Sequence, residues 1–443
     1  MRSVGTDPTV PFAAVRLLAS QVADATRGVL RGPDVEVDGA SFDSRTLAAG
    51  QLFVPIVADR DGHDFVDAAL AGGAAAYLTS RGTVGGTAVE VADTATALMD
   101  LAGWVRRRLD VPVIAITGSV GKTSTKDLLA AALGASHRVA ANERSFNNEQ
   151  GLPVTILGAP DDVEVLIVEM GMRGPGEITR LCDIAAPTVG VVTAVAGAHG
   201  ERLGGLDGVA AAKRELVEAL PASGTAVLNA DDARVAAMAA HTEASVVTFG
   251  VAGDVRVSGV ELDALARPRF RVDTPWGAGD VHLAVSGEHM VSNAAAALAA
   301  TGVVAGSIDA ALGALSEARV SGMRMDVRRT PSGAVVVNDA YNANPASATA
   351  GLRALGRMRA DRRVAVLGPM GELDDPVAGH REVAATAREL GIELVAVGTD
   401  LYGVEPTDDP VAAVGPLTSG DAVLVKASRA AGLEWVAAAL LSG

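Results

Sequence analysis

The chain has 443 residues, enough for two to four domains that each bury a core of their own. Its formal net charge of −16 argues against a nucleic-acid partner, because a phosphate polymer would be repelled except at a local basic patch. The densest basic cluster, Arg106 to Arg108, is short and is expected to mark the end of a helix.

Cys182 is the only cysteine, which excludes a disulfide framework and a thiolate metal site and fits a reducing cytoplasm. The N-terminus lacks a secretory signal pattern. Glycines interrupt the most apolar stretch, Ala294 to Leu315, so packed helices are expected there rather than a membrane insertion. Hydrophobic residues make up 49% and aromatics 3%, and strand and helix patterns alternate, which together predict an α/β fold with aliphatic cores.

Residues 1–92 alternate short strands and helices and are expected to form the first domain, followed by domains at 93–318 and 319–443. Within the first domain, Asp43, Ser44 and Arg45 offer an acceptor, a hydroxyl and a cationic fork. Such a turn could hold a sugar or a diphosphate. The alternative is a turn whose side chains are simply solvated.

The segment A-I-T-G-S-V-G-K-T-S-T-K, residues 115–126, predicts a phosphate-binding loop between a buried strand and a helix. Lys122 would supply positive charge to the outer phosphates, and the Thr123 hydroxyl can ligate Mg²⁺. The strict phosphate-loop pattern is not met, because Ile116 stands where its first glycine should be, so an ordinary glycine-rich turn is the alternative. The expected ATP-binding loop residues are Gly118, Ser119, Val120, Gly121, Lys122, Thr123 and Ser124.

Two candidate groups follow the loop. Asn147 and Asn148 have amides suited to a polar ligand, with turn formation as the alternative. An apolar strand, Val163 to Val168, then ends in Glu169. A carboxylate at the carboxyl end of a parallel strand can hold a nucleotide-bound Mg²⁺.

Three further side chains have an ordinary structural alternative. His199 could complete a metal or phosphate site, although a loop histidine is often structural. Lys213 is a surface lysine by its helical pattern unless carbamylation makes it an anionic ligand. Asn293, early in a strongly helical run, could contact a base edge or could instead cap or pack.

Residues 319–443 predict a second doubly wound domain, because strands at 335–337, 363–367, 394–397 and 422–425 alternate with helices. Pro345 suits the first turn of one of these helices. Lys426 and Arg429 stand at the last strand-to-helix turn, which is a favourable place to bind an anion.

These blocks, in this order, resemble the Mur ligase family over essentially the whole chain, through T-G-S-V-G-K-T-S, V-E-M-G, A-H-G-E and A-A-K-R-E. S-F-N-N-E-Q-G-L-P, D-A-Y-N-A-N-P and V-L-G-P-M-G-E-L with V-K-A-S-R-A are similar to the branch that joins D-alanyl-D-alanine to a UDP-N-acetylmuramoyl-tripeptide. The resemblance implies a cytoplasmic, monomeric, ATP-dependent ligase of peptidoglycan precursor synthesis. It also implies three domains: a UDP-substrate domain, a central ATPase domain and a Rossmann-like C-terminal domain.

The resemblance also implies roles for individual residues. Thr123 and Glu169 would hold one Mg²⁺, while His199 and a carbamylated Lys213 would hold a second. The nucleotide would also be contacted by Asn293, Arg324 and Asp339. The UDP-muramoyl peptide would face Asp43, Ser44, Arg45, Asn147 and Asn148. The incoming dipeptide and the closed site would involve Asn342, Asn344, Lys426, Ser428 and Arg429.

The chain departs from the family pattern at Ala194, where asparagine is common, at Pro369, where aspartate is usual, and at Ala427, where glycine is usual. The last two departures bear on the dipeptide assignment more than on ATP binding. One alternative function is another Mur-type ligase, adding diaminopimelate or lysine to a UDP-muramoyl-dipeptide. The other is a nucleotide-dependent switch that makes no bond.

Overall fold

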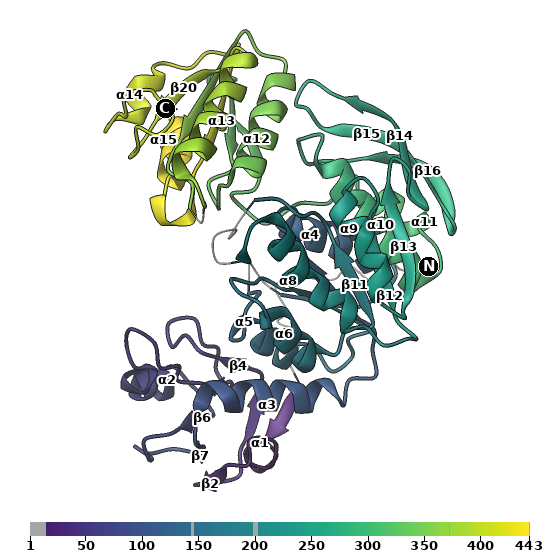
Figure 1. Ribbon diagram of the computed structural model, residues 1–443. Helices are drawn as coiled ribbons and strands as arrows, with labels where there is room; N and C mark the ends of the chain where they lie inside the picture. Colours follow the sequence, from purple (N-terminus) through teal and green to yellow (C-terminus); the bar gives the residue numbers. More distant parts are fainter. Residues whose placement is uncertain (1–14, 143–145, 198–202, 372, 443) are drawn as a thin grey trace, which may run out of the picture. The chain divides into compact units, whose positions relative to one another are not determined.

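The computed structural model (Figure 1) describes residues 15–142, 146–197, 203–371 and 373–442. The chain forms two compact units. The first contains Met1–Val113, Arg138–Met170 and Arg180–Pro187, and the second contains Ile114–His137, Gly171–Thr179 and Thr188–Gly443.

The first unit holds an N-terminal sheet in the order β2-β7-β6-β5-β4, parallel except between β2 and β7. A separate antiparallel pair joins β1 to β3, and β9 pairs in parallel with β10. The strands are β1 (Arg16–Leu18), β2 (Val29–Arg31), β3 (Glu36–Asp38), β4 (Ala40–Ser41), β5 (Leu52–Phe53), β6 (Ala76–Thr79), β7 (Ala88–Glu90), β9 (Val139–Ala141) and β10 (Val165–Glu169). The helices are α1 (Ala19–Thr26), η1 (Gly62–Phe65), α2 (Val66–Ala71), α3 (Thr94–Arg106), α5 (Gly151–Leu157) and most of α6 (Glu177–Ala185).

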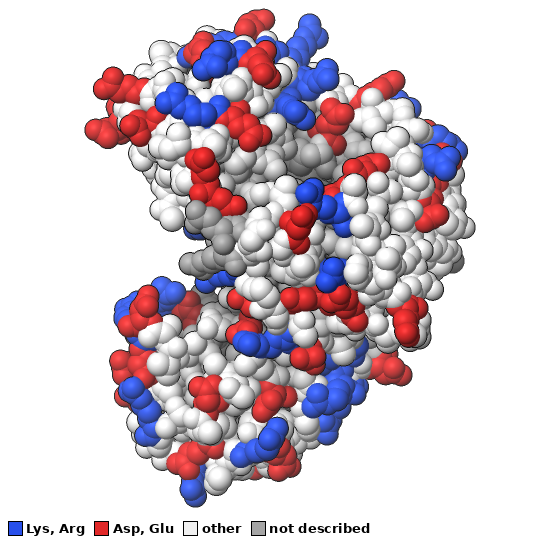
Figure 2. Space-filling model, in the orientation of Figure 1, with Lys and Arg blue, Asp and Glu red and all other residues white. Residues whose placement is uncertain are grey.

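Helix α3 ends at Arg106, as the basic cluster predicts, but Arg106 itself is buried. Its guanidinium donates to the carbonyl oxygens of Ala185 (2.7 Å), Leu109 (2.7 Å) and Ala186 (3.1 Å). It therefore ties the end of α3 to the end of α6 instead of adding to a basic surface. On the face drawn in Figure 2, Lys and Arg side chains are interspersed with Asp and Glu.

In the central part of the second unit the strand order is β16-β15-β14-β13-β12-β11-β8. Pairing is parallel from β8 to β14 and antiparallel from β14 to β16. The strands are β8 (Val113–Thr117), β11 (Val189–Val192), β12 (Thr225–Asn229), β13 (Ser245–Gly250), β14 (Val255–Leu262), β15 (Pro268–Thr274) and β16 (Gly277–His282). The helices are α4 (Lys122–Gly134), α8 (Leu206–Glu218), α9 (Ala233–Ala236), η2 (Ala237–His241), α10 (Met290–Ala305) and α11 (Asp309–Ala314).

The alanine-rich helix α10 is strongly apolar and mostly buried, and it packs against α4 and strands β12 to β15. It ends at Gly306, whose φ of 69° forms a left-handed cap. The sequence-based expectation of packed helices is thus confirmed. Within the residues that the structure describes, no helix combines the length and the apolar character needed to cross a membrane.

The C-terminal part of the second unit has a sheet in the order β17-β18-β21-β19-β20, with only β17 antiparallel. Val423 and Val425 pack with residues of α15, whereas Leu424 lies against Gly351 of α12, so helices cover both faces. The strands are β17 (Asp326–Arg329), β18 (Val335–Asn338), β19 (Arg362–Leu367), β20 (Glu393–Ala396) and β21 (Asp421–Lys426). The helices are α12 (Pro345–Arg357), α13 (Pro376–Glu389), α14 (Pro410–Val414), η3 (Arg429–Ala431) and α15 (Glu434–Ser442).

The α/β fold class is confirmed, with largely parallel sheets and a doubly wound C-terminal part. Pro345 occupies the first turn of α12, as expected. Strand β10 begins at Val165, two residues after the expected Val163, and α3 ends at Arg106, the first residue of the basic cluster that was expected to mark its end. The domain boundaries at 92/93 and 318/319 stay a prediction.

Arg106→Met should lower the free energy of unfolding by about 2–4 kcal/mol, because buried carbonyl oxygens lose their donors while the aliphatic stem is kept. Urea denaturation followed by circular dichroism measures this change. Arg107→Met is the matched control, because Arg107 is exposed, and it should change stability by less than about 0.5 kcal/mol. Equal effects of the two substitutions would contradict the role given to Arg106.

Candidate active site

The phosphate-loop candidate lies between β8 and α4, as predicted. Gly118 and Gly121 have φ of 151° and 84°. A Cβ at Gly118 would lie 1.9 Å from Thr193 Oγ1, and one at Gly121 would lie 2.4 Å from Asn293 Oδ1. Both positions therefore require glycine for conformation and for space.

Lys122 begins α4, and its Nζ donates to the Gly118 carbonyl oxygen at 2.7 Å. The ammonium thus lies over the loop, next to the partial positive charge of the helix N-terminus. Thr123 and Ser124 follow in the buried first turn of α4. This concentration of positive charge and glycine backbone suits the binding of phosphate groups.

The segment that follows β11 braces this loop. Thr193 Oγ1 donates to the Val120 carbonyl oxygen at 2.6 Å, and Ser119 N donates to the Ala194 carbonyl oxygen at 2.8 Å. Ala194 therefore contacts the loop through its backbone. This contact does not require the asparagine side chain that is common at this position in the family. Thr193 was not predicted as a site residue. His199 lies outside the described residues.

Lys213 lies on α8 and is buried, which differs from the surface position that its helical pattern suggests. Burial lowers the pKa of Lys213 well below its ordinary value, and the positive charge of Lys122 lowers it further. Both effects favour the neutral amine.

In the first unit, Glu169 ends β10 and is 1% exposed. Its Oε1 accepts from Asn147 Nδ2 at 2.8 Å, and its backbone N–H donates to Asn142 Oδ1 at 2.9 Å. The structure thus brings Asn147 and Glu169 together, and Asn142 is a member of this group that sequence analysis missed. Asn148 Oδ1 instead accepts the N–H groups of Gln150 and Gly151 at the start of α5, which matches the turn alternative.

Asp43 and Arg45 also pair with each other. Arg45 donates from Nε to Asp43 Oδ1 (2.9 Å) and from a terminal nitrogen to Asp43 Oδ2 (2.7 Å). The side-chain hydrogen bond from Arg45 lowers the pKa of Asp43 to about 2. Since the Arg45 side chain is 83% exposed, this turn matches the solvated-turn alternative. Binding of the UDP substrate by Asp43, Ser44 and Arg45 remains a proposal.

Asn293 is buried on α10 and backs the phosphate loop at Gly121. Its Nδ2 lies 3.5 Å from Met290 Sδ. The side chain therefore packs beneath the loop, as one of the alternatives foresaw. Its contact with a base edge stays a prediction.

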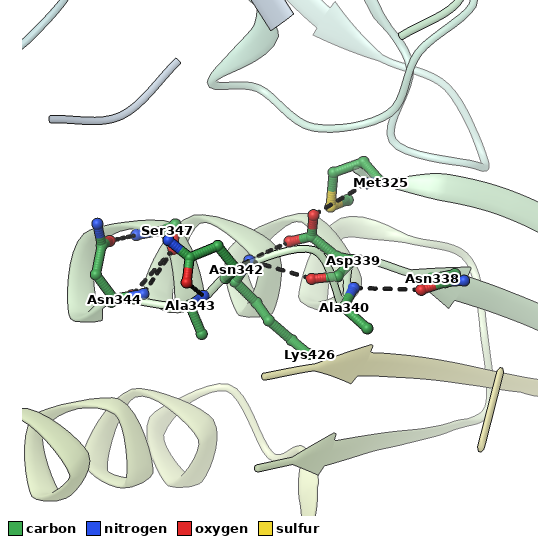
Figure 3. Close-up of polar contacts among 9 residues, drawn as sticks. All are labelled: Met325, Asn338, Asp339, Ala340, Asn342, Ala343, Asn344, Ser347 and Lys426. Atoms are coloured by element: carbon green, nitrogen blue, oxygen red, sulfur yellow. Dashed lines mark hydrogen bonds and ion pairs between the residues drawn. The ribbon is translucent and has the colours of Figure 1, made fainter. Parts of the chain in front are cut away.

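The C-terminal candidates centre on a buried ion pair that joins β21 to the segment after β18 (Figure 3). Lys426 Nζ lies 2.6 Å from Asp339 Oδ2 and donates to the Asn342 carbonyl oxygen at 2.9 Å. The two side chains are 3% and 13% exposed. Asp339 Oδ1 also accepts the Met325 N–H at 3.1 Å. Lys426 and Asp339 thus hold the loop that follows β18, a role that sequence analysis did not assign to them.

The remaining C-terminal candidates have local partners. Asn344 caps α12 by accepting the Ser347 N–H at 2.9 Å, as Figure 3 shows. Arg429 donates to Glu434 Oε1 at 2.8 Å and is half exposed. Arg324 stacks on the Tyr341 ring, and Ser428 is buried two residues after the end of β21.

Lys426→Met should lower the free energy of unfolding by about 3–5 kcal/mol, because Asp339 would remain buried without its cation. Adding Asp339→Asn should recover much of this loss, since a neutral amide still accepts the Met325 N–H. A double-mutant cycle in urea measures the coupling. Additive losses from the two substitutions would contradict a coupled pair.

Comparisons with known proteins cover most of the chain. Residues 116–301 match the family model of the Mur ligase middle domain, and residues 323–441 match that of the Mur ligase glutamate ligase domain. A UDP-N-acetylmuramoyl-tripeptide–D-alanyl-D-alanine ligase of Mycobacterium bovis is 38% identical, with 97% of this chain and 98% of the relative covered.

Two solved structures are similar along nearly their whole length. A MurF of Acinetobacter baumannii has a TM-score of 0.87 at 27% identity, covering 98% of this chain and all of that one. A MurF ligase of Thermotoga maritima in complex with ADP has a TM-score of 0.80 at 28% identity, covering 91% and 96%. Since these matches include both the phosphate loop and the C-terminal ion pair, the chain belongs to the Mur ligase family.

Proposed function

We propose that this enzyme joins D-alanyl-D-alanine to UDP-N-acetylmuramoyl-tripeptide, at the expense of ATP, in the cytoplasmic synthesis of the peptidoglycan precursor. The observation that carries the proposal is the end-to-end match to relatives named for this reaction. The ADP complex of one similar structure supports the use of ATP. A monomer stays the expected state.

The reaction requires activation of a carboxylate, because its charge repels an amine and oxide is a poor leaving group. An oxygen of the tripeptide's terminal carboxylate attacks the γ-phosphorus of ATP, and the bond to the β–γ bridging oxygen breaks. The products are an acyl phosphate and ADP. The neutral amine of D-alanyl-D-alanine then attacks the acyl carbon, and the tetrahedral intermediate loses a proton from nitrogen and expels phosphate as the amide forms.

The first step brings two anions together. At an effective dielectric constant near 20, two like unit charges about 4 Å apart repel by roughly 4 kcal/mol. Lys122 and the start of α4 supply compensating positive charge, which favours the transfer of the phosphoryl group.

Mg²⁺ fits the oxygen donors available. Thr123 offers a hydroxyl and Glu169 a carboxylate, both hard ligands, and we assign them to one ion. Among the described residues no group of three or more His, Cys, Asp or Glu side chains suits a metal ion. Bound Mg²⁺ supplies charge neutralisation at the β- and γ-phosphates.

We assign His199 and a carbamylated Lys213 to a second Mg²⁺. The lowered pKa of Lys213 supports this assignment, because only the neutral amine adds carbon dioxide. The addition forms an N–C bond, releases a proton and gives an anionic oxygen ligand.

The remaining predicted contacts form part of the proposal. Asn293, Arg324 and Asp339 are assigned to the nucleotide. The UDP-muramoyl peptide is assigned to Asp43, Ser44, Arg45, Asn147 and Asn148. The dipeptide and the closed site are assigned to Asn342, Asn344, Lys426, Ser428 and Arg429.

Sustained ADP release over many turnovers should require UDP-N-acetylmuramoyl-tripeptide and D-alanyl-D-alanine together, and a coupled assay with product mass measures this. Lys122→Ala should reduce turnover by at least about a thousandfold, because the loop loses its full positive charge. Circular dichroism should show that the variant stays folded.

Three outcomes would argue against the assignment. ADP release with a single amino acid instead of the dipeptide would identify another Mur-type ligase. ADP release without a longer product would indicate a switch. Near-normal turnover of Lys122→Ala would contradict the role of the loop.

Lys213→Ala should be severely impaired and partly rescued by a short carboxylic acid, which can supply the missing anionic oxygen. Turnover should also fall in buffers freed of bicarbonate and recover when bicarbonate is returned. Full activity of the unaltered chain without bicarbonate, over hours of incubation, would count against carbamylation.

A further inference from the structure

A short turn, residues 368–370, follows the carboxyl end of β19. Hydrogen bonds from other parts of the chain hold the backbone of this turn. We call it the β19 turn. Gly368 N donates to the Lys426 carbonyl oxygen of β21 at 3.0 Å, and Ser428 N, after β21, donates to the Pro369 carbonyl oxygen at 2.9 Å. The Tyr402 hydroxyl donates to the Gly368 carbonyl oxygen at 2.8 Å. Few of its polar groups are left to be satisfied by water.

The fourth contact comes from a histidine on α13. Met370 N lies 3.0 Å from His380 Nε2, and His380 Nδ1 lies 2.6 Å from the Pro376 carbonyl oxygen. A carbonyl oxygen only accepts, so Nδ1 carries the proton and Nε2 accepts the Met370 N–H. The geometry therefore requires the neutral imidazole in one tautomer.

The two side chains that hold the turn are themselves buried. His380 is 1% exposed and Tyr402 is 2% exposed, and their rings pack edge to face with centroids 4.7 Å apart. Burial also lowers the pKa of His380, which keeps the imidazole neutral. Both side chains are committed to holding the turn.

The location of the turn connects it with ligand binding. In open α/β sheets, ligands bind at the carboxyl ends of the strands, which is where β19 and β21 release the chain. Pro369 is the partly exposed residue of the turn, and the half-exposed Arg429, which donates to Glu434, follows β21. A guanidinium is suited to the free carboxylate that a dipeptide carries.

We propose that His380 is a positioning residue for the incoming dipeptide: it fixes the Met370 N–H and thereby the shape of the β19 turn at the acceptor site. This assignment rests on the proposed function. Tyr402 holds the other end of the same turn through Gly368. Small displacements of a positioning segment are enough to weaken productive binding.

Two substitutions of His380 separate its two hydrogen bonds. In His380→Gln the side chain reaches as far as Nε2, so an amide oxygen can still accept the Met370 N–H. In His380→Asn the side chain ends near Nδ1 and leaves that N–H without an acceptor. We expect the KM for D-alanyl-D-alanine to rise about tenfold in His380→Asn and less than about threefold in His380→Gln, with the KM for ATP unchanged in both.

Tyr402→Phe gives a second test that keeps the ring packing, and it should raise the KM for the dipeptide without changing the KM for ATP. Thermal denaturation of every variant controls for folding. Equal dipeptide KM values in both His380 variants, or a parallel rise in the KM for ATP, would overturn the positioning role alone. Absence of dipeptide-dependent ADP release by the unaltered chain would overturn the proposed function and this assignment with it.

Discussion

Burying a cation is costly unless fixed oxygen atoms surround it, and this constraint separates the roles of three basic side chains. Arg106 donates to backbone carbonyl oxygens, and Lys426 pairs with the Asp339 carboxylate. Both tie separate segments of the chain together. Lys213 differs, because burial and the nearby charge of Lys122 favour its neutral form. A neutral lysine amine, unlike a charged one, can add carbon dioxide.

A second constraint is that a loop leaving a parallel strand must be held in place by side chains from other segments. The phosphate loop after β8 is braced by Thr193 and Asn293, which belong to other elements. The β19 turn is braced in the same way by His380 and Tyr402. In both places, packed side chains from elsewhere fix a backbone that carries no regular structure. Preorganisation of this kind avoids an ordering cost when a ligand binds.

Local sequence patterns predicted the parts of the molecule that depend on local physics. Strand β8, the glycines of the loop and helix α4 follow from apolar runs and glycine spacing, as do the alternating elements of the C-terminal sheet. Contacts between residues distant in sequence gave no such signal. Asn142 meets Glu169, and His380 meets Met370, only because the fold brings different elements together. Equally, no pattern could show that Arg106 is buried.

The two C-terminal departures from the family pattern meet at the β19 turn. A Cβ at Gly368 would lie 2.8 Å from the Ala427 Cβ and 2.8 Å from Leu433 Cδ1, so the methyl group of Ala427 fills space that only glycine at 368 leaves open. Proline at 369 has no N–H, and the turn uses its carbonyl oxygen, which Ser428 N contacts. Both substitutions therefore preserve the backbone contacts on which the turn depends. A site shaped by backbone groups tolerates changes of side chain. Pro369 and Ala427 are therefore compatible with the proposed binding of the dipeptide.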